Sequence, residues 1–189
     1  WVHTSVGHDP LNLGAADTVI VSSAIRADNL ELMAARQRGL RVLHRSAGLG
    51  ALMLGRVGVA IGGTHGKTTT SAMTAVMFAG AGVDPGFVVG SPISGLGRAE
   101  HLGGGAPFVI EADESDGSFR QYPAQVVVVT NIEADHLDNW GTAEHYFDGF
   151  ALLCRQPLVR TVVLSADDQS TEALRPLVEG DGRRVITVG

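Results

Sequence analysis

The residues best suited to chemistry form a glycine-rich loop at positions 62–69, with the sequence GGTHGKTT, between an apolar run and a helix-like segment. Such a loop binds phosphate because its backbone N–H groups, and those at the start of the following helix, point at the anion. Lys67, the only lysine of the chain, would neutralise the outer phosphate oxygens, and the hydroxyl of Thr68 would ligate Mg²⁺. Ile61 stands where the common motif has its first glycine, so the match is to a shorter variant. A glycine-rich turn without a ligand is the alternative.

Acidic residues and a histidine follow two later apolar runs, 108–110 and 126–129. In open α/β sheets ligands bind at the carboxyl ends of the strands, and Mg²⁺ prefers oxygen ligands. Glu111, the first residue beyond the earlier run, is therefore the best-placed carboxylate. His136 is a less usual neighbour of Mg²⁺, so the residues alone favour a general base or a group that orients a ligand. Three further acidic residues are interpreted as solvated loop residues or helix caps, namely Asp116, Glu133 and Asp138.

Apolar β-rich runs alternate with helix-like segments along the whole chain. Strands are predicted at 18–22, 40–43, 57–61, 87–90, 108–110, 126–129, 161–164 and 184–188. Helices are predicted at 28–38, 49–54, 67–81, 142–155 and 169–179, the last of them broken or kinked at Pro176. This alternation predicts an α/β fold whose mainly parallel sheet is covered by helices on both faces.

Local signals specify the first helix and one long loop. Asp28 is predicted to cap the first helix, because Glu31 stands at the capping-box position. The apolar face of this helix is expected to comprise Leu30, Met33 and Ala34. The glycine-rich stretch 90–105 is expected to form an exposed loop.

Composition excludes several classes of protein. The 189 residues include 25 glycines, and 44% apolar with 18% charged residues is typical of a globular protein. The net charge of −6, without any basic run, argues against nucleic-acid binding, and no apolar stretch approaches the ~18 residues of a membrane span. Cys154 is the only cysteine and lies in an apolar run, which excludes an internal disulfide and favours a core residue over a nucleophile. The N-terminus shows no signal-peptide pattern, so we expect a cytoplasmic protein.

Taken together, these segments resemble the Mur ligase family of peptidoglycan synthesis. The resembling stretches are GTHGKTTT at 63–70, EADESDGSF at 111–119 and TNIEADHLD at 130–138, with GHD at 7–9 and SSAI at 22–25 extending the similarity upstream. The resemblance covers essentially the whole chain. Because members of this family have three domains and this sequence begins without Met, we expect an incomplete chain.

The resemblance also implies a domain organisation. Residues 1–55 would be the C-terminal part of a Rossmann-like N-terminal domain that binds the UDP-sugar. Residues 56–189 would be most of a central ATP-binding domain of the P-loop type, itself incomplete. The C-terminal domain and the uridine-binding loop of the family would lie outside the chain, so we expect this piece alone to be inactive.

The chemistry implied by the family is ATP-dependent formation of an amide bond in peptidoglycan precursor synthesis, and thereby in cell-wall biogenesis, cell shape and cell division. ATP would phosphorylate the carboxylate of UDP-N-acetylmuramate to an acyl phosphate. The amino group of L-alanine would then attack and release phosphate through a tetrahedral intermediate. The partners implied are therefore these two substrates, with ATP and Mg²⁺ as cofactors.

Functional roles carry over position by position. The ATP phosphates would be bound by Gly63, Thr64, His65, Gly66, Lys67, Thr68 and Thr69. Mg²⁺ would be held by Thr68, Glu111 and His136, so the resemblance favours a ligand role for the histidine. The catalytic residues would be Lys67, Glu111 and His136. Substrate contacts would come from His8, Ser22, Ser23 and Asn131, the first three toward the UDP part.

Two alternative functions stay open. A related ligase attaches a whole peptide to the same sugar nucleotide and resembles this chain in the phosphate loop, but we expect a different stretch in place of ESDGS at 114–118. The other alternative is a non-catalytic nucleotide-binding paralogue. The segment 140–156 lacks the lysine that many later-acting members carry in carbamylated form, which favours the alanine-adding branch. The sequence does not specify the oligomeric state.

Overall fold

The computed structural model describes residues 2–189, which divide into two compact units, one up to Leu52 and the other from Met53 to Gly189. The first unit contains a parallel pair of strands, β1 (Thr18–Val21) and β2 (Arg41–His44). Its helical elements are η1 (Pro10–Leu13), α1 (Leu30–Gln37) and nearly all of α2 (Arg45–Met53). Among the described residues of this unit, which ends at Leu52, the buried apolar side chains are Leu13, Leu32 and Ala35.

The details of α1 differ from the sequence prediction. Asn29, not Asp28, is the N-cap, and its side chain accepts a hydrogen bond from Leu32 N at 3.1 Å. The buried positions are Leu32 and Ala35, whereas Leu30 is 57% exposed, so the predicted apolar face was wrong. The physical reason is that five of the eight helical residues are apolar, which makes two different faces compatible with the same pattern.

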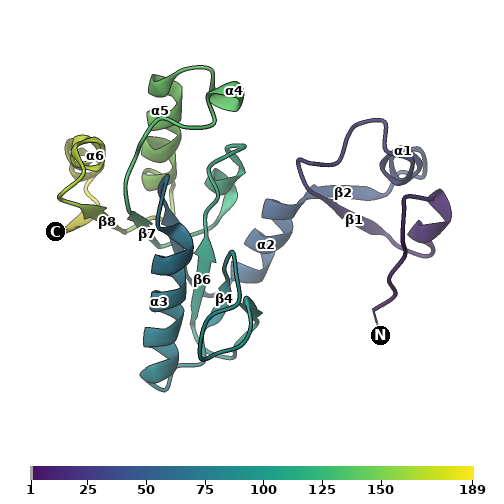
Figure 1. Ribbon diagram of the computed structural model, residues 1–189, viewed down its shortest axis with the longest axis horizontal. Coiled ribbons are helices and arrows are strands. Elements are labelled where there is room, and N and C mark those ends of the chain that lie inside the picture. The colour runs from purple at the N-terminus through teal and green to yellow at the C-terminus, as the bar shows by residue number, and fades with distance from the viewer. Residues whose placement is uncertain (1) are drawn as a thin grey trace. The chain divides into compact units, whose positions relative to one another are not determined.

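The second unit is built on a seven-stranded sheet with the order β5-β4-β6-β3-β7-β8-β9. Strands β4, β6, β7 and β8 of this sheet are labelled in Figure 1. Its strands are β3 (Val57–Gly62), β4 (Gly86–Val88), β5 (Glu100–His101), β6 (Pro107–Glu111), β7 (Val126–Val129), β8 (Thr161–Ser165) and β9 (Arg184–Val188). Every neighbouring pair is parallel except β4 and β5. The α/β class with a mainly parallel sheet is confirmed.

Helices cover both faces of this sheet. The helical elements are α3 (Lys67–Gly80), η2 (Ser118–Gln121), α4 (Leu137–Trp140), α5 (Ala143–Cys154) and α6 (Gln169–Gly180). Ile61 of β3 packs with Ala75 of α3, while a side chain at the next residue, Gly62, would meet Phe150 and Leu153 of α5. Because successive strand residues point to opposite faces, α3 and α5 lie on opposite sides of the sheet. No helix within residues 2–189 is long and apolar enough to cross a bilayer.

Two further predictions need correction in this unit. The stretch 90–105 is not simply an exposed loop, because Ile93 is buried within it and β5 pairs with β4. Helix α6 is not broken at Pro176, because it is continuous over Gln169–Gly180, so of the predicted break or kink the break is wrong. Leu174 and Val178, on either side of this proline, are fully buried, and their packing holds the helix together despite the missing N–H.

The lone cysteine lies in the core, as predicted. Cys154 is the last residue of α5 and its side chain is fully buried. Burial raises the pKa of its thiol to about 12, so the reactive thiolate is suppressed at neutral pH.

Candidate functional site

The glycine-rich loop connects the buried end of β3 to the N-terminus of α3. Gly63 and Gly66 adopt φ values of +133° and +80°, which glycine tolerates and other residues rarely do. An added Cβ at Gly63 would also overlap the hydroxyl oxygen of Thr130. Thr70 N donates to Gly66 O, so the N–H groups just before Thr70 lie at the open N-terminus of α3, where an anion is stabilised.

Two residues that follow β7 fix this loop. Asn131 Oδ1 accepts from His65 N at 2.8 Å, and Asn131 Nδ2 donates to His65 O at 3.0 Å. Thr130 Oγ1 donates to the same His65 O at 2.6 Å, and Thr64 N donates to Asn131 O at 3.0 Å. The Asn131 amide, for which a substrate contact was predicted, is thus bonded to the loop backbone. In this structure it holds His65 in place.

Lys67 lies at the base of the loop. Its Nζ donates to Gly63 O at 2.7 Å and to Thr64 O at 3.0 Å. The same Nζ lies 2.8 Å and 3.1 Å from the two carboxylate oxygens of Glu114. With its side chain 14% exposed, the ammonium is well placed to offset negative charge bound at the start of α3.

Glu114 is a site residue that sequence reasoning missed. It is 1% exposed, and its Oε1 accepts from the hydroxyl of Tyr146 at 3.4 Å. Tyr146 Oη in turn lies 2.9 Å from Thr64 Oγ1. Burial, reinforced by the negative charge of Glu114, raises the pKa of Tyr146, so this phenol stays protonated. In the sequence Glu114 is one of four acidic residues in EADESD, and nothing there distinguishes it from its solvated neighbours.

The structure brings Thr68 and Glu111 together. Thr68 Oγ1 donates to Glu111 Oε1 at 2.9 Å, and Gly90 N donates to Glu111 Oε2 at 2.7 Å. Glu111 is the last residue of β6 and not the first residue beyond it, because it still pairs with Ile61. An added Cβ at Gly90 would lie 2.9 Å from Glu111 Oε2, so glycine is required there for the close approach. A hydroxyl and a carboxylate side by side are donors that Mg²⁺ prefers.

His136 lies in a turn of unusual conformation. Within residues 2–189 it is the one non-glycine residue with positive φ, at +50°, and its Nε2 lies 3.9 Å from Asp135 Oδ2. The turn is anchored by Asn139 Nδ2 and Trp140 Nε1, each of which donates at 3.0 Å to a backbone carbonyl of the loop that follows β6. Strained conformations of this kind concentrate at functional sites.

The donor set bears on how a metal would be held. Among the described residues 2–189, no group of three or more His, Cys, Asp or Glu is arranged to hold a metal ion. The Thr68–Glu111 pair therefore fits an ion that takes its other ligands from water and phosphate, which is the usual mode for Mg²⁺. The structure does not bring His136 into hydrogen-bond contact with either member of that pair.

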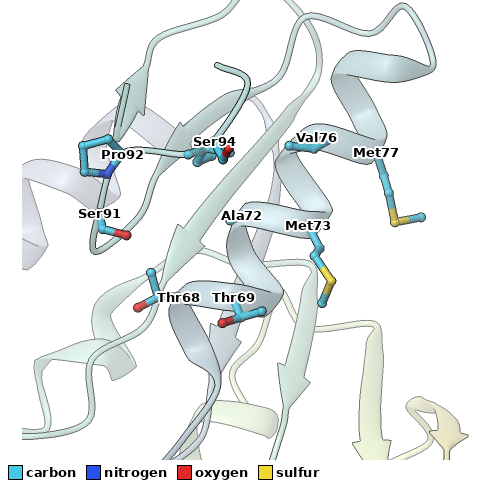
Figure 2. A pocket seen from close by; sticks show the side chains of 10 residues that line it. Thr68, Thr69, Ala72, Met73, Val76, Met77, Ser91, Pro92 and Ser94 are labelled. Carbon is cyan, nitrogen blue, oxygen red and sulfur yellow. The ribbon is translucent and has the colours of Figure 1, made fainter. Parts of the chain in front are cut away.

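A cavity of about 530 Å³ opens beside the start of α3. Figure 2 shows the hydroxyls of Thr68 and Thr69 at one end, and Met73 and Met77 further along the helix. Its lining comprises Thr68, Thr69, Ala72, Met73, Val76, Met77, Ser91, Pro92, Ile93 and Ser94. A cavity with a polar end and an apolar wall fits a ligand that carries an anionic group beside a less polar body.

The predicted substrate residues of the first unit lie in a more open setting. His8 Nδ1 lies 3.1 Å from Glu31 Oε2, and Asn12 Nδ2 donates to Glu31 Oε1 at 2.6 Å. The pKa of the Glu31 carboxyl group is lowered, mainly by its hydrogen bond with His8. Ser22 is half-buried and Ser23 is exposed, both directly after β1.

Two family models match the chain. The Mur ligase middle domain matches residues 61–189, and the Mur ligase family catalytic domain matches residues 2–56. The chain belongs to the Mur ligase family. Membership in the Mur ligase family confirms the resemblance drawn from the three motifs, and it places the glycine-rich loop and the two acidic segments in the middle domain.

Curated relatives within the Mur ligase family are UDP-N-acetylmuramate–L-alanine ligases. The protein from Cutibacterium acnes is 60% identical over the whole chain, which covers 40% of that relative. The protein from Kineococcus radiotolerans is 53% identical, again over the whole chain, which covers 41% of it. The chain therefore spans about two fifths of the length of the curated relatives that it matches.

Solved structures of the Mur ligase family share the fold. The UDP-N-acetylmuramate–alanine ligase of Thermotoga maritima matches with a TM-score of 0.81 at 30% identity, over 89% of this chain and 40% of that one. A UDP-N-acetylmuramate:L-alanyl-γ-D-glutamyl-meso-diaminopimelate ligase from Neisseria meningitides matches with a TM-score of 0.83 at 26% identity, over 96% of this chain and 61% of that one.

Proposed function

We propose that this chain is part of an ATP-dependent ligase that joins L-alanine to the carboxylate of UDP-N-acetylmuramate. The observation that carries the proposal is the rigid glycine loop, in which Lys67 and the Thr68–Glu111 pair lie together at the N-terminus of α3. Curated relatives with 60% and 53% identity bear this name. Since the chain spans only part of their length, the whole reaction is assigned to the longer protein.

The proposed reaction has two steps. The carboxylate of UDP-N-acetylmuramate attacks the γ-phosphorus of ATP, so that ADP leaves and an acyl phosphate forms. The amino group of L-alanine then attacks the acyl carbon, loses a proton and forms the amide as phosphate leaves with one former carboxylate oxygen. Lys67 would offset charge on the transferring phosphoryl group, and the N–H groups at the start of α3 would hold the phosphates.

The Thr68 hydroxyl and the Glu111 carboxylate would hold Mg²⁺, because both supply oxygen donors. When bound, the ion would neutralise phosphate charge. We keep His136 as a candidate third ligand, and its strained turn supports this assignment. Asn131 would act through the loop, because both ends of its amide bond His65.

The domain assignment forms part of the proposal. Residues 1–55 would belong to the UDP-sugar-binding domain, with His8, Ser22 and Ser23 toward the UDP part, and residues 56–189 to the ATP-binding domain. The family matches at 2–56 and 61–189 and the division into two compact units support this. Because the reaction consumes ATP and a sugar nucleotide, we place it in the cytoplasm.

A second candidate function is ligation of a peptide to the same sugar nucleotide. The observation that favours it is the TM-score of 0.83 to the Neisseria enzyme whose name states that specificity. The higher identity to L-alanine ligases, 60% against 26%, leads us to prefer the first candidate.

Release of ADP by the full-length protein tests both candidates. With UDP-N-acetylmuramate present, we expect kcat/KM for L-alanine to exceed that for the tripeptide L-alanyl-γ-D-glutamyl-meso-diaminopimelate by about 100-fold or more. A preference for the tripeptide would establish the second candidate. No ADP release with either acceptor would indicate a non-catalytic nucleotide-binding protein.

A further inference from the structure

The loop that follows β6 directs one carboxylate into the protein interior. Glu114 is 1% exposed. Among the described residues, Lys67 is the cation that lies within ion-pair distance of its carboxylate. A buried ion pair is weak evidence for stability, because desolvation of the two charges can exceed their mutual attraction. The retention of a charge at this position therefore calls for a role beyond holding the fold.

The backbone of this loop is held without that side chain. Glu114 O accepts from Trp140 Nε1 at 3.0 Å and from Gly117 N at 3.1 Å. The carboxylate points the other way, toward Lys67 and Tyr146. Its contacts thus leave the conformation of its own loop largely independent of its charge.

The contacts of Lys67 show what the carboxylate can do. A lysine ammonium is a flexible point charge with three donors and no directional preference of its own. Two N–H groups of the ammonium donate to the loop carbonyls of Gly63 and Thr64, and the third donates to the carboxylate of Glu114. Glu114 Oε2 approaches Nζ to 2.8 Å without making a hydrogen bond of its own, so charge attraction contributes to holding the ammonium there.

Tyr146 links this ion pair to the rest of the loop. Its hydroxyl contacts Glu114 Oε1 and Thr64 Oγ1, and Thr64 Oγ1 also donates to Glu133 O at 2.9 Å. Tyr146 belongs to α5, and its ring is fully buried. One rigid side chain therefore sets the position of both the carboxylate and the phosphate loop.

We propose that Glu114 is the positioning residue for Lys67, and that through their buried ion pair it aims the ammonium at the outer phosphate of ATP. This inference rests on the proposed function, since it assigns a role to a residue that acts through the phosphate loop. Glu114 itself does not contact ATP in this account. It acts on the step in which the phosphoryl group moves, where a displacement of about 1 Å can cost about 100-fold in rate.

The test compares kcat and the KM for ATP in full-length variants. Glu114→Gln keeps the shape of the side chain but removes its charge, and we expect kcat to fall by about 10-fold to 100-fold with the KM for ATP changed by less than about 3-fold. Glu114→Asp restores the charge one methylene shorter and should recover part of kcat. Glu172→Gln, which breaks an ion pair with Arg175 on the remote helix α6, is the matched control and should leave both constants unchanged.

Active-site titration and circular dichroism separate positioning from loss of folding. If the Gln variant is not folded, the Asp variant decides, with a lower kcat at an unchanged KM for ATP expected. The inference is overturned if the folded Glu114 variants turn over at the wild-type rate, or if kcat falls only in proportion to the folded fraction. Lys67→Ala separates the inference about Glu114 from the role assigned to Lys67 itself. If Lys67→Ala is inactive while Glu114→Gln is normal, only the inference fails. If Lys67→Ala turns over normally, the assignment of Lys67 to the reacting phosphate fails with it. The proposed function itself fails separately, if the wild-type full-length protein releases no ADP with L-alanine.

Discussion

The two units present their candidate functional residues in opposite ways. In the second unit, the phosphate loop follows the central strand of a seven-stranded sheet and is held by Thr130, Asn131 and Glu114. In the first unit, the candidate residues flank a pair of short strands. The side chain of His8 is 53% exposed and forms an ion pair with Glu31.

The difference shows where preorganisation comes from. Helices on both faces of a wide sheet bury most residues of its central strands, here β3 and β6, so the loops at their carboxyl ends begin from fixed points. Each added hydrogen bond then fixes a group that already has little freedom. A two-stranded sheet has no such interior, so we expect substitutions in the first unit to have smaller effects than matched substitutions in the second.

Removal of Lys67 should have the largest effect. Lys67→Ala leaves phosphate charge uncompensated, and we expect kcat of the full-length protein to fall by about 1000-fold or more. Steady-state release of ADP measures this. Arg38→Ala in the first unit, which removes a hydrogen bond to Gly14 O, is the control and should retain normal turnover. Near-normal turnover of Lys67→Ala would show that the loop does not bind the reacting phosphate.

Two glycine substitutions compare the rigidity of the units directly. Gly63→Ala forces a Cβ onto Thr130 at a φ of +133°, and we expect a loss of about 3 kcal/mol in unfolding free energy. Gly39 in the first unit has a φ of +67°, and a Cβ added there would meet no atom within 4 Å. Gly39→Ala should therefore lower the unfolding free energy only by the backbone strain, about 1 kcal/mol. Urea unfolding of the two variants measures both values. Equal losses would contradict the difference in packing.

Within the second unit, we expect the Mg²⁺ requirement to depend on Glu111 far more than on Glu133. Glu111→Gln keeps the side-chain shape but removes the carboxylate charge, and we expect the Mg²⁺ concentration at half-maximal activity to rise about 10-fold. Glu133→Gln, at a 70% exposed side chain that does not contact Thr68, should shift it far less. An unchanged magnesium titration for Glu111→Gln would move the metal site elsewhere.

The smallest effect is expected in the first unit. The hydrogen bond with His8 lowers the pKa of Glu31, so its stabilisation is present above the pKa of the unfolded state and is lost as pH falls through the lower folded value. Glu31→Gln should therefore speed hydrogen exchange in η1 and α1 at pH 7 by less than about 5-fold, as for an exposed pair. The variant and the wild type should converge as the pH falls through the pKa of Glu31 in the folded state. A larger effect at low pH would contradict this assignment.

The same contrast explains how much the sequence could predict. Apart from β5, the strands of the second unit are short apolar runs, and the glycine loop carries its motif between such a strand and a helix, so both were predicted at nearly the right residues. The predicted apolar face of α1 was wrong because the many apolar residues of this helix are compatible with two orientations. Glu114 was missed because the burial of one of the four carboxylates in EADESD depends on tertiary contacts with Lys67 and Tyr146, which lie 47 and 32 residues away.

The central claim is that the second unit supports transfer of a phosphoryl group to a carboxylate. Its most direct test uses UDP-N-acetylmuramate labelled with ¹⁸O in the carboxylate, turned over by the full-length protein with ATP and L-alanine. The account predicts that one ¹⁸O atom per turnover appears in the released phosphate, because that oxygen bridges the acyl phosphate. Phosphate free of ¹⁸O, released in step with amide formation, would contradict it.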